Sequence, residues 1–178
     1  AILDAIRILR RKYGHHVAIV GKVMGPWTLA YHLYGIQDFL METYTDPDKV
    51  HRFLDRLKEI TVLFGLAQIR AGADALCLAD HATGDLVGPW TYRDFLLPVH
   101  QELTGRIGCP LVLHICGDTL DRLDHICEAG FDCFHFDSKV DARAAVDEVD
   151  GRISWQAREI EAPRQLRRRG DRPPRRRC

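Results

Sequence analysis

The chain has 178 residues, of which 46% are hydrophobic and 28% are charged, a composition typical of one globular domain. It contains no run of the roughly 18 apolar residues that a membrane-spanning helix needs, and six cysteines are too few for a disulfide scaffold in a chain of this length. We therefore expect a cytoplasmic protein with free thiols that does not associate with a membrane.

The net charge of zero conceals two segments of opposite charge. Residues 1–156 hold 16 Lys and Arg against 22 Asp and Glu, whereas residues 157–178 hold nine Arg against three acidic residues. These counts predict a folded acidic domain over 1–156 and a disordered Arg-rich tail over 157–178. The tail is also typical of GC-rich DNA read in a shifted frame, and resequencing the gene around codon 157 tests that hypothesis.

The first half of the domain is predicted to contain three helices and a strand. Residues 1–14 form an amphipathic pattern typical of a helix. Residues 16–25, HVAIVGKVMG, have the composition of a strand that ends at a Gly-Pro turn, and a short helical segment, TLAYHLYG, follows. A long helix comes next, N-capped by Asp46 with Pro47 at its first position and ended by Gly72.

In the second half, short β-rich runs alternate with helical runs. Helices are predicted over 91–108 (kinked at Pro98), over 118–130 and over 141–149. The predicted strands are 74–80 (DALCLAD), 110–116 (PLVLHIC), 133–137 (CFHFD) and 152–156 (RISWQ). This alternation predicts a parallel α/β fold.

The repeated βα units favour part of a (β/α)8 barrel of the TIM type. AGADALCLAD and AGFDCFHFD share a helix-ending Ala-Gly, an Asp, a strand and a final Asp. A doubly wound sheet is the alternative, but no glycine-rich phosphate loop follows any strand. About five βα units cannot close an eight-stranded barrel, which typically takes about 250 residues, so we expect a partial barrel.

His114 and Cys116 stand two residues apart at the end of the predicted 110–116 strand, so their side chains share one face. In a barrel this face points inward, while the intervening aliphatic residues pack on the outer helices. An imidazole and a thiolate placed in this way can both bind one zinc ion, and Gly117 then leaves room for a ligand. A buried thiol beside a hydrogen-bonded core histidine explains the same spacing equally well.

Asp80 and Asp137 each end a strand, so both should face the same mouth as Cys116. Each is a candidate substrate contact, and the alternative is that each caps the loop that follows it. His81, next to Asp80, is a weaker candidate of the same kind. The remaining cysteines of the domain are predicted to be core or loop residues: Cys77, Cys109, Cys127 and Cys133.

Five segments, in this order, carry a resemblance to a known family. They are GPWTLAYHLYG, DPDKVHRFLDRL, GADALCLADHATGDLVGPWTYRDFLLPVH, LHICGDT and GFDCFHFDSKVD. Together they resemble the uroporphyrinogen decarboxylase superfamily, and within it the corrinoid-dependent methyltransferases that act on methylcobamide and coenzyme M. The resemblance covers about residues 1–156.

The resemblance implies that His114 and Cys116 are zinc ligands, because these methyltransferases carry His-x-Cys-Gly here and the decarboxylases carry no metal. It implies methyl transfer from methylcobamide, held by a corrinoid carrier protein, to a small thiol such as coenzyme M. The family's third zinc ligand is a cysteine on a later strand, and we expect this chain to stop before it; Cys178, in the tail, is not assigned that role. Asp80 lies in the loop region where the family has an acidic residue near the metal, so the resemblance makes it a candidate further ligand or substrate contact.

Two other functions remain open. Metal-free decarboxylation of the uroporphyrinogen type predicts that His114 and Cys116 can be replaced without loss of activity. Alternatively, the chain is an inactive half barrel whose tail, 157–178, binds nucleic acid; RNA binding would then depend steeply on salt and be lost with the tail. We favour this reading least, because the tail has no aromatic residues and resembles no known binding fold.

Overall fold

The computed structural model describes the backbone of residues 1–157 and the side chains of residues 1–154. The tail predicted over 157–178, with Cys178 and the nucleic-acid-binding alternative, lies outside the described residues apart from the backbone of Ala157. Within the described part of the chain, no helix is both long and apolar enough to cross a membrane.

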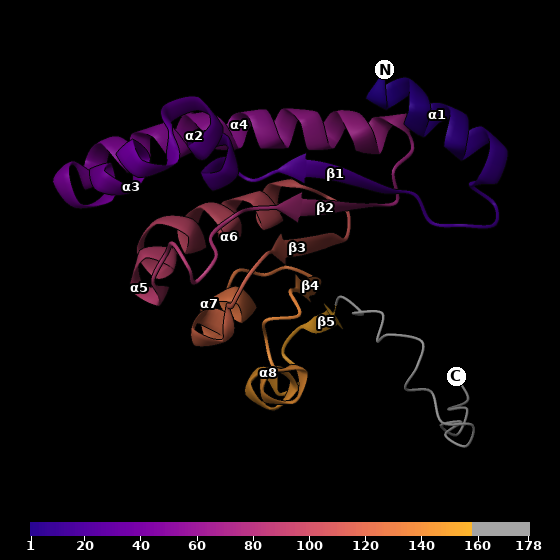
Figure 1. The fold of residues 1–178 in the computed structure, drawn as a ribbon. Helices are drawn as coiled ribbons and strands as arrows, with labels where there is room; N and C mark the ends of the chain where they lie inside the picture. Colours follow the sequence, from indigo (N-terminus) through magenta and orange to yellow (C-terminus); the bar gives the residue numbers. More distant parts are fainter. Residues whose placement is uncertain (158–178) are drawn as a thin grey trace, which may run out of the picture.

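Five parallel strands form one sheet whose spatial order follows the sequence (Figure 1). They are β1 (Val20–Met24), β2 (Ala75–Ala79), β3 (Leu111–Ile115), β4 (Cys133–Phe136) and β5 (Ser154–Ala157). A doubly wound sheet requires the strand order to reverse, and the order of these five strands does not. The prediction of a parallel α/β fold is therefore confirmed, and the doubly wound alternative is wrong for the described strands.

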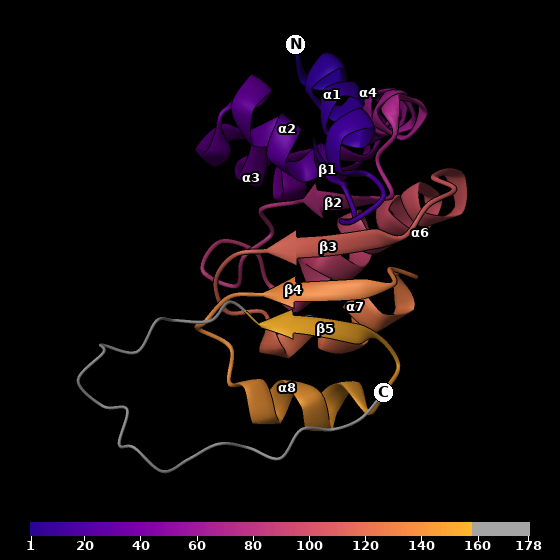
Figure 2. The ribbon, with the colours of Figure 1, turned by 90° about the vertical axis from the view of Figure 1, so that its right-hand side faces the viewer.

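Helices cover one face of this sheet. Figure 2 shows the strands in front with α6 and α7 behind them. The principal helices are α1 (Ile2–Tyr13), α2 (Pro26–Tyr34), α3 (Ile36–Thr45), α4 (Pro47–Ala71), α6 (Leu97–Arg106), α7 (Leu123–Glu128) and α8 (Ala142–Val149). Single turns precede two of them: α5 (Pro89–Thr91) with a π-turn (Tyr92–Leu96), and a 3₁₀ turn (Leu120–Arg122). The strand residues that face the helices are almost fully buried, among them Leu76, Leu78, Leu111, Leu113, Ile115, Phe134 and Phe136.

The long helix α4 begins and ends where the sequence predicts. The Asp46 carboxylate accepts a hydrogen bond from the backbone N–H of Lys49 at 3.0 Å, and Pro47 occupies the first helical position. Gly72 ends the helix with a φ of 112°, a left-handed conformation that favours glycine. Both capping predictions are confirmed.

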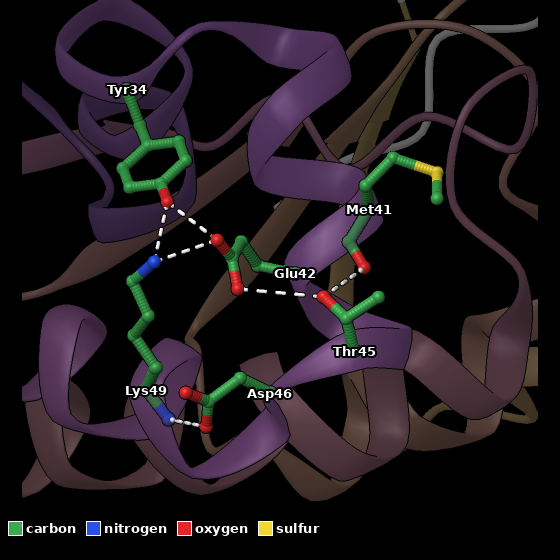
Figure 3. Close-up of polar contacts among 6 residues, drawn as sticks. All are labelled: Tyr34, Met41, Glu42, Thr45, Asp46 and Lys49. Atoms are coloured by element: carbon green, nitrogen blue, oxygen red, sulfur yellow. Dashed lines mark hydrogen bonds and ion pairs between the residues drawn. The ribbon is translucent and has the colours of Figure 1, made fainter.

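Helix α3 was not predicted, and its position depends on contacts with its neighbours. Gly35, with a φ of 95°, turns the chain between α2 and α3. Figure 3 shows the Glu42 carboxylate of α3 accepting hydrogen bonds from the Tyr34 hydroxyl of α2 and the Lys49 ammonium of α4, each at 2.6 Å. The Lys49 ammonium holds the pKa of the Glu42 carboxyl below its usual range. These contacts link α2, α3 and α4, and the periodicity of the sequence does not reveal contacts between helices.

The helix predicted over 91–108 is interrupted, as Pro98 suggested. The irregular turn lies on the N-terminal side of the proline. The π-turn over Tyr92–Leu96 gives way to α6, in which Pro98 is the second residue. Pro98 has no N–H to donate to the carbonyl of Asp94, so regular α-helical bonding cannot run through this point.

Two side chains of α4 cover the outer edge of β1. The Gln68 amide, 1% exposed, accepts from the backbone N–H of Lys22 at 3.2 Å and donates to its carbonyl at 2.9 Å. The Thr61 hydroxyl donates to the Met24 carbonyl at 2.8 Å. A Cβ at Gly21 would lie 2.5 Å from Gln68 Oε1, so only glycine lets the amide approach. These contacts satisfy backbone groups that would otherwise leave an open sheet edge.

Replacing Gln68 with alanine should lower the free energy of unfolding by about 1–3 kcal/mol, because two backbone groups of Lys22 lose their partner. Urea denaturation measures the loss. Gln101→Ala is the matched control: its amide bonds a single carbonyl, that of Glu128, at the surface. That control should change stability by less than about 0.5 kcal/mol, and an equal loss in both variants would contradict the role given to Gln68.

Candidate functional site

The end of β3 brings His114 and Cys116 together. His114 Nε2 lies 3.1 Å from Cys116 Sγ, and both side chains are half-buried on the face of the sheet that α6 and α7 do not cover. Their aliphatic neighbours Leu113 and Ile115 are fully buried on the opposite face. The predicted division of this strand into an aliphatic face and a His-Cys face is therefore confirmed.

A backbone carbonyl of β4 orients the imidazole. His114 Nδ1 lies 3.1 Å from the carbonyl oxygen of His135, the residue in register with it on β4. A carbonyl can only accept, so Nδ1 carries the proton in this bond and Nε2 presents its lone pair toward Cys116 Sγ. Metal-binding histidines are commonly fixed in this way. The ring of His135 lies 4.6 Å from that of His114, and the sequence reading did not select it although CFHFD places it on the same face.

The tripeptide His-Ile-Cys occurs twice, and only one copy forms a pair. His125, Ile126 and Cys127 lie in α7, where residues two apart are turned about 200° from each other. His125 Nδ1 instead lies 3.8 Å from the Glu128 carboxylate. The strand's period of two, and not the residue types alone, therefore creates the pair at His114 and Cys116.

Gly117 allows a sharp backbone turn directly after Cys116. Its φ is 84°, and a Cβ there would lie 2.0 Å from Thr83 Oγ1 in the loop after β2. Thr83, 3% exposed, therefore occupies the space into which a side chain at position 117 would project. Gly117 is not among the residues that line the neighbouring pocket, and its place beside a ligand stays a prediction.

A pocket of about 200 Å³ opens at the ends of β1, β2 and β3. It is lined by Lys22, Met24, Thr28, Ala79, Asp80, His81, His114 and Cys116. Four of the residues selected from sequence therefore meet around one hollow. Asp137 is not among them: its carboxylate accepts from the Ser138 hydroxyl at 3.1 Å and the Lys139 N–H at 3.2 Å, which is the loop-capping alternative.

The Asp80 carboxylate is directed into the protein, although the residue lines the pocket. Asp80 is 2% exposed; its Oδ1 accepts from the Thr28 N–H, at the start of α2, at 2.7 Å. Its Oδ2 lies 3.0 Å from His100 Nε2, and His100 Nδ1 lies 2.9 Å from the Tyr92 hydroxyl. Asp80 therefore caps α2, a role that neither the substrate-contact prediction nor its loop-capping alternative named.

Asp80, His100 and Tyr92 form a hydrogen-bonded chain that is almost free of solvent. His100 and Tyr92 are both 0% exposed. Burial raises the pKa of the Tyr92 phenol well above its usual value, so the hydroxyl remains a donor to the imidazole. A Cβ at Gly25 would lie 2.1 Å from the Asp80 carboxyl carbon, which explains the glycine before α2. His100 and Tyr92 were not predicted from the sequence. The signal that could have identified His100 is a histidine within an apolar helical run.

The donor set at His114 and Cys116 is of the kind that zinc prefers, a neutral imidazole and a thiol sulfur. Within residues 1–154, no three His, Cys, Asp or Glu side chains are grouped to hold a metal ion. In the described part of the chain, His114 and Cys116 thus supply two of the donors that a zinc ion would need. The other described cysteines are all half-buried, and burial raises the pKa of their thiols: Cys77, Cys109, Cys127 and Cys133.

Comparison with known proteins adds independent information. The model of the uroporphyrinogen decarboxylase (URO-D) family matches residues 1–156. A methylated-thiol–coenzyme M methyltransferase of Methanosarcina mazei is 41% identical over 138 residues, which are 77% of this chain and 38% of that protein. The methylcobamide:CoM methyltransferase MtaA of Methanosarcina barkeri is 34% identical, over 85% of this chain and 45% of its own length. A uroporphyrinogen decarboxylase of Mannheimia succiniciproducens is 29% identical.

A solved structure agrees with these relatives. The structure of a methyltransferase from Methanosarcina mazei superposes with a TM-score of 0.83 at 30% sequence identity. The match covers 88% of this chain and 47% of that one. The chain therefore spans less than half the length of the relatives that it matches.

Proposed function

The chain belongs to the uroporphyrinogen decarboxylase (URO-D) family, and from that premise we propose that it carries the zinc-binding strand of a methyltransferase. The enzyme transfers a methyl group from methylcobamide, held by a corrinoid carrier protein, to a small thiol such as coenzyme M. The pairing of His114 Nε2 with Cys116 Sγ at 3.1 Å is the observation that carries this proposal.

The five parallel strands and the helices between them form part of a (β/α)8 barrel of the TIM type, with the open face of the sheet toward the barrel interior. The sequential order of the parallel strands supports this assignment, as does the layer of helices, α6 and α7 among them, behind the sheet in Figure 2. The candidate residues stand at the carboxyl ends of the strands, where barrel enzymes build their active sites.

The residues around the pocket have distinct tasks in this proposal. His114, fixed through Nδ1, and Cys116 hold the metal. Asp80 and His81 line the pocket and contact the substrate. Zinc, when bound, supplies a positive charge that deprotonates a thiol at neutral pH. About 200 Å³ is below the roughly 300–1,000 Å³ of sites for drug-sized ligands, so the pocket suits a small thiol while a corrinoid remains outside. We place the protein in the cytoplasm, where a ligating thiol stays reduced.

Cobalt(II) titration of the 178-residue chain tests the metal assignment, because cobalt replaces zinc and gives a thiolate-to-cobalt absorption band. The wild-type chain should show the band, and the His114→Ala, Cys116→Ala double variant should lose it. The chain contains a matched control in its second His-Ile-Cys: the His125→Ala, Cys127→Ala variant should keep the band at wild-type intensity.

Two outcomes would overturn the metal assignment. Either the wild-type chain shows no thiolate-to-cobalt band, or the band survives unchanged in the His114→Ala, Cys116→Ala variant. Metal-free decarboxylation would then become the better supported function, given the decarboxylases among the relatives.

A further inference from the structure

Lys22 stands across the pocket from His114. The register pairs Lys22 with Cys77, and it pairs Ala79 with Met24 on one side and His114 on the other. All of these side chains lie on the face of the sheet away from α6 and α7. Because Ala79 carries only a methyl group, the space over β2 stays open between the lysine on β1 and the imidazole on β3.

The positive charge of Lys22 is not compensated by the described side chains around it. Lys22 is the only Lys or Arg that lines the pocket, and its ammonium makes no ion pair or hydrogen bond with a side chain of residues 1–154. The acidic residue in the same wall is Asp80, and both of its oxygens are engaged by Thr28 and His100. The pocket therefore offers an anion one unpaired ammonium.

The backbone of Lys22 is fixed by hydrogen bonds. Gln68 binds both the N–H and the carbonyl of Lys22, which fixes the backbone from which the side chain projects. Burial raises the pKa of the Cys77 thiol, and the positive charge of Lys22, its partner in the register, opposes that rise. Binding an anion with Lys22 therefore does not require the backbone of this residue to be ordered first.

We propose that Lys22 is a specificity-determining residue of this pocket and binds the anionic end of a small substrate whose other end reaches His114 and Cys116. An ammonium offers three N–H donors and a full charge to a carboxylate or a sulfonate. This inference rests on the proposed function, because it concerns the substrate of the same pocket. It adds a residue on β1 that has no part in metal binding.

An NMR titration of the metal-free 178-residue chain tests the assignment without any catalytic step. Ethanesulfonate and propionate serve as probes with the two kinds of anionic end, and 1-propanol serves as the neutral probe. We expect saturable shifts at the amides of the pocket residues with one or both anions and none with 1-propanol. The two anionic arms distinguish a sulfonate site from a carboxylate site.

Lys22→Gln should weaken binding of the anion about tenfold, the order expected for loss of a charge-assisted contact. Lys22→Arg should retain most of the affinity. Lys12→Gln on α1 removes the same charge away from the pocket and should leave the dissociation constant unchanged. Equal affinity in Lys22→Gln and the wild-type chain would overturn the inference, as would an absence of saturable anion binding by the wild-type chain.

The failure of this inference and that of the proposed function can be told apart. If the cobalt band depends on His114 and Cys116 but the affinity for the anion is the same with and without Lys22, only the specificity assignment is overturned. If anion binding depends on Lys22 but no thiolate-to-cobalt band forms, the metal assignment falls and the anion site stands.

Discussion

Replacing Asp80 with alanine is expected to lower the free energy of unfolding by about 3–5 kcal/mol, the range found when one partner of a buried polar pair is removed. The variant leaves the Thr28 N–H without its acceptor at the start of α2 and leaves His100 Nε2 without its partner in a site with no access to water. The loss should appear as a lower denaturation midpoint with an unchanged slope.

A graded series separates the contribution of Asp80 from that of its neighbours. Tyr92→Phe removes only the last hydrogen bond of the chain, so it should cost about 1 kcal/mol. Asp94→Ala, at an exposed carboxylate paired with Arg93, should change stability by less than about 0.5 kcal/mol. An Asp80→Ala variant as stable as Asp94→Ala would show that the buried chain does not support the end of β2.

Gly117→Ala is expected to lower the free energy of unfolding by about 2–4 kcal/mol, through a left-handed backbone conformation and a steric clash together. The added methyl group would meet Thr83 Oγ1, and φ at this position is 84°. Because Gly117 follows Cys116 directly, the relief of this strain should also move the thiol. The cobalt band should therefore weaken in the same variant.

Gly105 provides the matched control for that substitution. It lies inside α6, and a Cβ there would meet nothing within 4 Å. Gly105→Ala should stabilise the protein by up to about 1 kcal/mol, because alanine favours a helix interior over glycine. If Gly117→Ala left both the unfolding midpoint and the cobalt band as they are in Gly105→Ala, the close approach of Thr83 would not matter to the site.

The features predicted correctly are those that local geometry decides. Asp46, Pro47 and Gly72 mark the ends of α4 through bonds and backbone angles within a few residues of each other. The shared face of His114 and Cys116 follows from the period of two in any strand. Helix α3 escaped prediction because Glu42 is held by side chains of two other helices, which no local pattern reveals.

The alternation of strands and helices, the capping of α4 and the shared face of His114 and Cys116 follow from the sequence alone, since each depends on neighbours along the chain. The role of Asp80 depends on the folded chain, because its partners His100 and Thr28 lie 20 and 52 residues away in the sequence. The same holds for Gly117, whose contact with Thr83 exists only once two strand ends are adjacent. Lys22 and His114 likewise line one pocket only because β1, β2 and β3 lie side by side. Long-range contacts of this kind arise when distant segments pack, so the residues that carry them have no local signature.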